Sequence, residues 1–374
     1  MKKVTALLAV LALALFAARI GGAANAHSAA PVCPAPPIGY THCHALVVVD
    51  AHGNPQASSS PTGLSPAKLE SAYGYNIAAT SGAGKTIGIV DAYDDPTAES
   101  DLAVFSSQYG LPACTTANGC FAKVNQTGGT SYPRKDSGWA LEISLDIQWA
   151  HAIAPGAKIL LVEASSNSFA NLLAAEDYAK AHAQYVSNSW GASEFSGESS
   201  YDGHFVQSGV SFFVSSGDSG TPAEYPSASP NVISVGGTTL NFDRSGNFTS
   251  ETGWSGSGGG CSAYESKNSA QNTGSVNCSG KRATPDVSLD ADPSSGVSVY
   301  DTTRYQGQTG WFTVGGTSAS SPMWAGRSAD AGALVNAAYV YGSSITFRDI
   351  TSGSNGASAL PGYDLVTGRG SWIG

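Results

Sequence analysis

The chain has 374 residues, only 12% of them charged, and a formal net charge of −10. This balance leaves no basic surface for nucleic acid or for an anionic membrane, and the length suits one large α/β enzyme domain. The 45 glycines indicate many tight turns, and few charged side chains remain to repel one another when acid protonates the carboxylates. The composition is therefore compatible with an acidic working environment.

Residues 1–26 have the pattern of a secretory signal peptide. Met1-Lys2-Lys3 is a basic start, Ala6 to Ala18 is an apolar run, and Ala24-Asn25-Ala26 is an A-x-A cleavage motif. The run is too short to span a bilayer, and no later stretch is long and apolar enough to do so. We therefore expect a secreted, extracellular protein that does not bind a membrane.

The six cysteines fall as near neighbours along the chain. They allow about fifteen connectivities, and proximity favours Cys33–Cys43, Cys114–Cys120 and Cys261–Cys278. A cysteine metal site is disfavoured because the sequence has no C-x-x-C pair. His42 and His44 flank Cys43, but adjacent residues of an extended chain are expected to point to opposite faces.

Residues 27–63 form a short segment rich in proline and serine. Leu46 to Val49 could add an edge strand, and the segment is too short for a separate large domain, so we interpret it as an N-terminal or pro-segment. A helix is predicted from Ser65, a capping residue followed by proline, to Gly74. Residues 64–374 are predicted to form the single main domain.

Short apolar runs then alternate with stretches of helical period. The predicted strands are 86–91, 157–163, 185–191, 210–218 and 232–237, and the predicted helices between them include 99–109 and 168–184. This alternation indicates an α/β fold with a mostly parallel sheet and helices on both faces. In such sheets ligands bind outside the carboxyl ends of the strands, which is where Asp91, Trp190 and Asp218 fall.

The helix predicted from Ser137 to about Ala154 carries two acids in largely apolar surroundings. Glu142 and Asp146 are four residues apart, so both lie on one face of the helix. An acidic stripe that faces solvent is the usual explanation of such a pair. The Leu, Ile and Trp residues around it indicate a buried helix, in which two stacked acids repel each other unless one is protonated.

The stretch from Val314 to Gly326 combines a glycine turn with a serine at the start of a predicted helix. Gly315 and Gly316 allow a tight turn, Ser318 lies where the turn opens into a predicted helix, and Pro322 is expected in the first helical turn. A capped helix after a glycine turn is the ordinary interpretation. A serine at such a helix start is also placed where the helix dipole stabilises an alkoxide.

Three blocks together resemble the sedolisin family of serine-carboxyl peptidases, in particular its kumamolisin-like members, which share the subtilisin fold. They are Glu142…Asp146 on a helix leading to Ala154-Pro155-Gly156, then Ser215-Ser216-Gly217-Asp218, then Gly316-Thr317-Ser318-Ala319-Ser320. The blocks occur in the order of the family and the resemblance covers essentially residues 65–374.

The resemblance implies a role for each matching residue. Ser318 is implied as the nucleophile, Glu142 as its general base and Asp146 as the partner that orients Glu142 and shares its proton. Asp218 is implied in the oxyanion hole, with Asp91 and Trp190 in the supporting network behind Glu142. A carboxylate base suits an acidic medium, where an imidazole would be charged and useless. The implied activity is that of a secreted, acid-acting endopeptidase on unfolded or acid-denatured polypeptides, and we expect a monomer.

The C-terminus carries a second match to the same family. Asp349 and Asp364 are implied to bind one structural Ca²⁺ by their side chains, with the carbonyls of Ile350, Leu360 and Gly362, because carboxylates and carbonyls suit a hard cation. Two exposed loop acids without an ion are the alternative interpretation, and we favour calcium. By the same resemblance, a stretch from His27 to about Thr62 is what could serve as a pro-segment.

Three alternatives stay open on the sequence alone. A histidine-based subtilase is disfavoured because Glu142 stands where that family has its histidine, and His151 lies more than two turns farther along the helix. A lipase-type hydrolase would show G-x-S-x-G, which the Ser318 context lacks. A non-catalytic, secreted peptide-binding relative is disfavoured because Ser318, Glu142 and Asp218 are all present.

Overall fold

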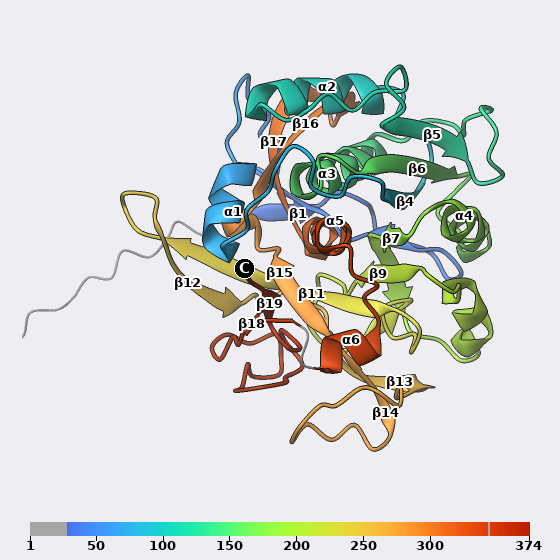
Figure 1. The fold of residues 1–374 in the computed structure, drawn as a ribbon, viewed down its shortest axis with the longest axis vertical. Coiled ribbons are helices and arrows are strands. Elements are labelled where there is room, and N and C mark those ends of the chain that lie inside the picture. Colours follow the sequence, from blue (N-terminus) through green and yellow to red (C-terminus); the bar gives the residue numbers. More distant parts are fainter. Residues whose placement is uncertain (1–27, 343–344) are drawn as a thin grey trace, which may run out of the picture.

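The computed structural model describes residues 28–342 and 345–374, so the predicted signal peptide lies outside the described residues. An eight-stranded sheet forms its centre, in the order β12-β11-β9-β7-β4-β6-β5 with β15 beside β11 (Figure 1). Its strands are β4 (Thr86–Ala92), β5 (Phe121–Asn125), β6 (Lys158–Ala164), β7 (Tyr185–Asn188), β9 (Ser211–Ser215), β11 (Ile233–Phe242), β12 (Phe248–Gly253) and β15 (Val287–Asp290). Only the β11–β12 pairing is antiparallel within it. The predicted parallel sheet is confirmed.

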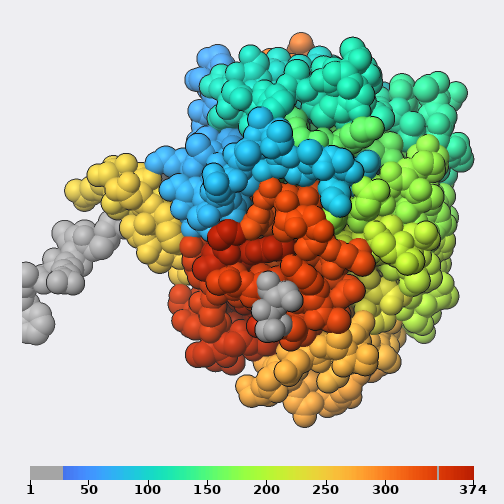
Figure 2. All heavy atoms as spheres, in the orientation of Figure 1, coloured from blue at the N-terminus to red at the C-terminus, as the bar shows by residue number. Residues whose placement is uncertain are grey.

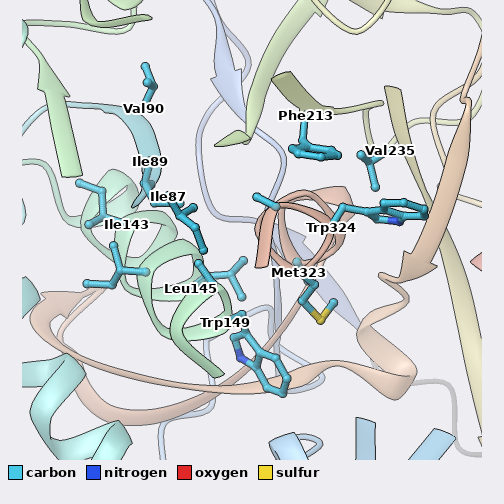
Figure 3. Packing of buried hydrophobic residues seen from close by; sticks show 14 of the residues in the cluster. Ile87, Ile89, Val90, Ile143, Leu145, Trp149, Phe213, Val235, Met323 and Trp324 are labelled. Carbon is cyan, nitrogen blue, oxygen red and sulfur yellow. The ribbon is translucent and has the colours of Figure 1, made fainter. Parts of the chain in front are cut away.

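Helices cover both faces of this sheet. α3 (Ser137–Ile153) and α5 (Thr317–Ala331) lie side by side on one face, where Figure 3 shows Ile87 of β4 on the side of α3. The alternate residue Gly88 faces α4 (Phe169–His182), since a Cβ there would come within 3.2 Å of Ala183 Cβ. α3 and α5 approach closely because a Cβ on Gly326 would lie only 2.9 Å from Ile153 Cβ. This close contact aligns the acids of α3 with the start of α5.

A second sheet packs against α3 and α2 (Ala98–Tyr109). Its order is β1-β3-β17-β16, with β1 (Ala29–Pro31), β3 (Leu46–Val48), β16 (Val297–Tyr305) and β17 (Gln308–Gly315). The strand expected at Leu46–Val49 is present as β3, but it lies inside this sheet between β1 and β17, and the edge strand is β1, which was not predicted. Through β1 and β3, residues of the N-terminal segment are therefore part of the main fold.

The remaining elements surround these layers. They are α1 (Pro66–Tyr73), α6 (Ala337–Tyr341), the 3-10 helices η1 (Glu198–Phe205) and η2 (Pro293–Ser295), a small sheet of β2 (His42–Cys43), β8 (Trp190–Ser193) and β10 (Glu224–Tyr225), and the pairs β13 (Gly260–Ser266) with β14 (Lys281–Thr284) and β18 (Phe347–Arg348) with β19 (Ser371–Trp372). Figure 2 shows the C-terminal segments gathered on one face, next to the β13–β14 region. The predicted disulfides Cys33–Cys43, Cys114–Cys120 and Cys261–Cys278 are all formed. In residues 28–342 and 345–374, no helix combines the length and apolarity needed to cross a bilayer.

Two predicted boundaries were wrong near the site. The predicted strand 185–191 is interrupted, because β7 ends at Asn188 and β8 belongs to another sheet. α5 begins at Thr317, so Pro322 lies inside the helix and not in its first turn. Proline has no N–H to bond the carbonyl of Ser318, and Ser189 Oγ lies 3.5 Å from that oxygen as its donor.

Candidate active site

Ser318 lies in the first turn of α5, fully buried. Strand β17 ends at Gly315, and Gly316 turns the chain with φ of +92°, a conformation that glycine adopts without strain. A Cβ on Gly316 would collide with both the His44 carbonyl oxygen and Asp218 Oδ2. The Ser318 hydroxyl donates to the Ser189 carbonyl at 3.3 Å.

Three carboxyl groups converge beside the serine. Asp91 is near the end of β4, Glu142 and Asp146 project from α3, and carboxylate oxygens of the three lie within 4.8 Å of one another. All three side chains are fully buried. The predicted shared face of Glu142 and Asp146 is therefore present, and it faces the interior, not solvent.

Burial and mutual repulsion dominate the electrostatics of this cluster. Burial raises the pKa of Asp91 to about 8. Burial first, and then the charges of Asp146 and Asp91, raise the pKa of Glu142 well above its usual range, and burial with Asp91 does the same for Asp146. The Ser318 hydroxyl opposes the rise at Glu142 by favouring its ionised form, although in this conformation it donates to Ser189. The cluster thus retains protons at acidic pH.

Trp190 holds the end of β4 in place. Its indole Nε1 donates to the carbonyl of Val90 at 3.0 Å, and its side chain is fully buried. Val90 precedes Asp91, so Trp190 supports the backbone that carries this carboxyl, and its indole N–H donates to a carbonyl, not to a carboxylate.

Asp218 follows β9 and is fixed by α5. Its Oδ1 accepts from Thr317 N at 2.7 Å and from Thr317 Oγ1 at 2.9 Å, while Oδ2 is buried without a hydrogen-bond partner among the described residues. Burial raises its pKa to about 7, against the charge of His44 and the bonds from Thr317. Below that pH the carboxyl is protonated and can donate through Oδ2.

The sequence analysis missed His44, Ser215 and Glu224. His44 Nδ1 lies 2.7 Å from Ser215 Oγ and Nε2 lies 3.1 Å from Glu224 Oε2. The two histidines on either side of Cys43 are two residues apart and share a face, as strand alternation requires, with ring centroids 5.0 Å apart. The H-x-H pattern was the available signal, but nothing local identified Ser215 or Glu224 as its partners.

The predicted calcium ligands also lie together. Asp349 Oδ2 accepts from Gly362 N and Asp364 Oδ2 accepts from Leu360 N, both at 2.9 Å. Both carboxylates are therefore hydrogen-bonded to the backbone of the same turn. The carbonyls of Ile350, Leu360 and Gly362 accept no hydrogen bond from the described part of the chain. Two carboxylates and free carbonyls form a donor set that fits a hard cation.

Comparison with known proteins relates this geometry to peptidases. A model of the subtilase family matches residues 136–351. The chain is 29% identical to kumamolisin of Bacillus sp. (strain MN-32) over 367 residues, covering 85% of this chain and 63% of that protein. It is 28% identical to sedolisin of Pseudomonas sp. (strain 101), covering 84% of this chain and 60% of that protein. The chain thus spans about three fifths of the length of these curated relatives.

A solved structure shows the same fold. It is Pseudomonas sedolisin, described as a serine-carboxyl proteinase, in complex with two molecules of pseudo-iodotyrostatin. The TM-score is 0.70 at 30% identity, over 84% of this chain and 96% of the other. The parallel sheet with α3 and α5 on one face is therefore a subtilisin-like arrangement.

Proposed function

The chain belongs to the sedolisin-like peptidases of the subtilase family, and from this premise we propose that it is an acid-acting serine endopeptidase with a Ser318–Glu142–Asp146 triad. One observation carries the proposal: a buried carboxyl cluster, and not an imidazole, lies beside the serine at the start of α5. Its substrates are unfolded polypeptides. The three disulfides support secretion, as does the predicted signal sequence.

The acylation step follows from how protons are distributed among the three carboxyl groups of the cluster. Three carboxyls at this separation cannot all be ionised in a buried site, so the cluster keeps most of its protons at acidic pH. We assign the one ionised carboxylate of the reactive form to Glu142, because the Ser318 hydroxyl favours ionisation of that group. Glu142 then accepts the Ser318 proton as Oγ attacks the substrate carbonyl. The same proton passes to the leaving amine, and water hydrolyses the acyl-enzyme by the reverse route.

The oxyanion is stabilised from two sides. Ser318 N–H is one donor, and the protonated Oδ2 of Asp218 is the other, since Oδ1 is already engaged by Thr317. A carboxyl donates only while protonated, so this half of the oxyanion hole works below about pH 7.

Histidine bases are disfavoured by the positions of the nearest imidazoles. His151 Nε2 lies 2.9 Å from the carbonyl of Pro112. Both ring nitrogens of His44 are engaged by Ser215 and Glu224, leaving none for Ser318. A histidine subtilase is therefore the weaker interpretation, and the intact nucleophile and carboxyl cluster argue against a non-catalytic binding protein.

A calcium ion would be held by Asp349 and Asp364 with the carbonyls of Ile350, Leu360 and Gly362. A cation there would neutralise the two carboxylates and tie residue 349 to the 360–364 turn, which supplies stability and takes no part in the peptide cleavage.

The test is hydrolysis of an unfolded protein from about pH 2.5 to 8. We expect activity confined to acid, and a loss of about 10³-fold or more in both Ser318→Ala and Glu142→Gln. Folding of each variant is checked by circular dichroism. A neutral optimum that persists in Glu142→Gln would contradict the carboxylate base, and a folded protein without any cleavage would contradict the peptidase.

A further inference from the structure

Two histidines of the N-terminal segment face a glutamate of the main domain. His42 lies in β2 and His44 directly after it, Glu224 begins β10, and both strands pair with β8. The two imidazole rings meet edge to face, with an angle of 76° between their planes. One nitrogen of each ring and one oxygen of Glu224 all lie within 4.8 Å of one another. Three potential metal ligands therefore converge at one point.

This set of donors is one that transition metals prefer. Two imidazoles and one glutamate are a ligand set that proteins use for Zn²⁺, at bond lengths of about 2.0–2.2 Å. Two ligand atoms at such bond lengths on a tetrahedral ion lie about 3.3 Å apart. His44 Nε2 and Glu224 Oε2 are 3.1 Å apart, close to this spacing. Nitrogen ligands disfavour calcium and magnesium, which take oxygen.

Ser215 orients the His44 ring for such a bond. Ser215 Oγ lies 3.4 Å from the Asn188 carbonyl as its donor, so it accepts from His44 Nδ1 at 2.7 Å. With its proton on Nδ1, a neutral His44 presents the lone pair of Nε2 towards Glu224. Histidines that bind metals are usually held in this way, by a hydrogen bond from the second ring nitrogen.

His42 supplies the third ligand. Its Nδ1 is buried and has no hydrogen-bond partner in residues 28–342 and 345–374. A buried polar atom without a partner costs free energy, since water would satisfy it in the unfolded chain. Coordination gives a partner to a ring that otherwise lacks one at this nitrogen.

The three ligands are open to a cavity on one side and closed on the other. His42 and Glu224 line a cavity of about 940 Å³, through which an ion can reach them and water can take a fourth position. His44 is fully buried and closes the opposite side. A Cβ on Gly191 would come within 2.7 Å of His44 Cε1, so a glycine there leaves room for the ring.

We propose that His42, His44 and Glu224 form a Zn²⁺ site with a water molecule as the fourth ligand. The ion takes the place of a proton shared between His44 Nε2 and Glu224, and any such proton passes to solvent. This site is distinct from the C-terminal turn proposed for calcium, where every donor is an oxygen.

Zinc at this site ties the N-terminal segment to the reacting groups. Ser318 N donates to the His44 carbonyl at 3.0 Å, and His44 N donates to the Ser189 carbonyl at 3.1 Å. Ser318 Oγ donates to the same Ser189 oxygen. A metal that joins His44 to Glu224 therefore holds the backbone of His44 over Ser318. The consequence, that the bound ion keeps peptide substrates out, rests on the peptidase function proposed above, whereas the metal site itself does not.

Metal binding is tested by calorimetric titration of full-length Ser318→Ala with Zn²⁺ at about pH 7.5, with calcium in excess. We expect one zinc per chain, and at least about 100-fold weaker binding after a further His42→Gln or Glu224→Gln. Ser215→Ala should weaken binding by about 10–100-fold, because His44 Nδ1 loses its acceptor. Co²⁺ is the second probe, since its visible absorption reports four-coordinate binding to nitrogen.

His204→Gln is the matched control. His204 Nδ1 forms a similar pair with Asp177 Oδ2 at 2.9 Å, but the two belong to no group of three ligands among the described residues. We expect its zinc affinity to stay within about twofold. His42→Gln decides the outcome, because this ring is half-buried and the metal-free fold, checked by circular dichroism, should survive its loss. Absence of zinc binding, or binding that persists in His42→Gln and Glu224→Gln, would overturn the site.

The tie to the segment is tested by hydrogen exchange of the amides of residues 42–45 in Ser318→Ala. We expect exchange at least about tenfold slower with saturating zinc, and no effect of zinc in the added Glu224→Gln. Zinc binding without slower exchange would overturn the tie. Both measurements are made without the nucleophile, so their failure leaves the peptidase function standing, and failure of the peptidase function leaves the zinc site standing.

Discussion

Asp218 combines two tasks in one carboxyl group. Oδ1 accepts from the backbone and hydroxyl of Thr317, which fixes the group against the start of α5. Oδ2 has no partner among the described residues and faces the carbonyl of His44 across Gly316. Because only the protonated form donates, the proposed oxyanion hole should lose this donor above about pH 7.

Asp218→Asn should separate hydrogen-bond donation to the oxyanion from protonation of the carboxyl group. Its amide oxygen can accept from Thr317 while its NH₂ takes the place of the protonated Oδ2. We expect activity to extend above pH 7 in Asp218→Asn, and to fall about 10²-fold or more at every pH in Asp218→Ala. The pH dependence of kcat/KM checks this. An unchanged alkaline limit in Asp218→Asn would assign that limit to another group.

The residues of the site differ in how well the sequence alone predicts them. Glu142 and Asp146 were predictable as a pair because four residues of helix fix their shared face. Their burial depends on the packing of α3 against β4 and α5, which no local pattern encodes. The His44–Glu224 pair is separated by 180 positions, so only the folded chain brings it together.

At the scale of elements, α3 depends on its first turn. Asp136 caps it, with Oδ1 accepting from Gly138 N at 3.1 Å and Trp139 N at 3.2 Å. Asp136→Ala should lower the free energy of unfolding by about 1 kcal/mol, because both N–H groups lose their acceptor. Asp136→Asn keeps the cap and should cost much less. Urea unfolding in the Ser318→Ala background measures both, and equal losses would contradict a capping role.

The turn at 360–364 should make stability depend on calcium. Asp364 also accepts from the backbone of Leu360, Val366 and Thr367, so it is structural with or without an ion. Asp349 is exposed and accepts only from Gly362 N among described residues, which makes Asp349→Asn the cleaner variant. We expect chelation to lower the Tm of the wild type by roughly 5 °C or more, and that of Asp349→Asn much less. A Tm independent of calcium in the wild type would exclude the proposed ion.

The elements themselves were largely predictable because buried parallel strands are short apolar runs and the helices between them carry capping residues. The errors fall where tertiary contacts override local signals. The sequence predicts one strand over 185–191, yet the chain changes sheets at Ser189, whose carbonyl accepts hydrogen bonds from Ser318 Oγ and His44 N. α5 begins before Pro322 because the turn at Gly316 fits against Asp218, a contact outside any local window.

Across the whole molecule, buried carboxyls are spread well beyond the site. Burial raises the pKa of Asp301 and Glu176 to about 8, of Glu163 to about 9 and of Asp95 to about 6. Each would have a pKa near 4 in the unfolded chain. The unfolded state therefore loses these protons first as pH rises, so their favourable effect is complete below about pH 4 and is lost as pH rises through the folded values.

Two histidines, His42 half-buried and His151 fully buried, act in the opposite direction. Burial lowers the pKa of His42 to about 4 and also lowers that of His151. Below about pH 6.5 these two imidazoles bind protons in the unfolded chain but stay neutral in the folded protein. Their contribution therefore lowers the free energy of unfolding as pH drops towards 4. The carboxyls are the larger group, and the balance favours greatest stability in mild acid.

We therefore expect the Tm of Ser318→Ala, used to prevent self-digestion, to be highest near pH 4 to 5 and to fall by roughly 10 °C or more by pH 9. Glu176→Gln isolates one contribution, because the amide keeps the shape of the side chain and removes its titration. It should raise the Tm at pH 9 and leave it nearly unchanged at pH 4, as measured by calorimetry. A Tm that rises steadily from pH 4 to 9 would mean that these carboxyls are ionised in the folded protein. In that case the acidic optimum would have to come from the site alone, whereas the expected result would make acid a condition of the fold as well as of the proposed chemistry.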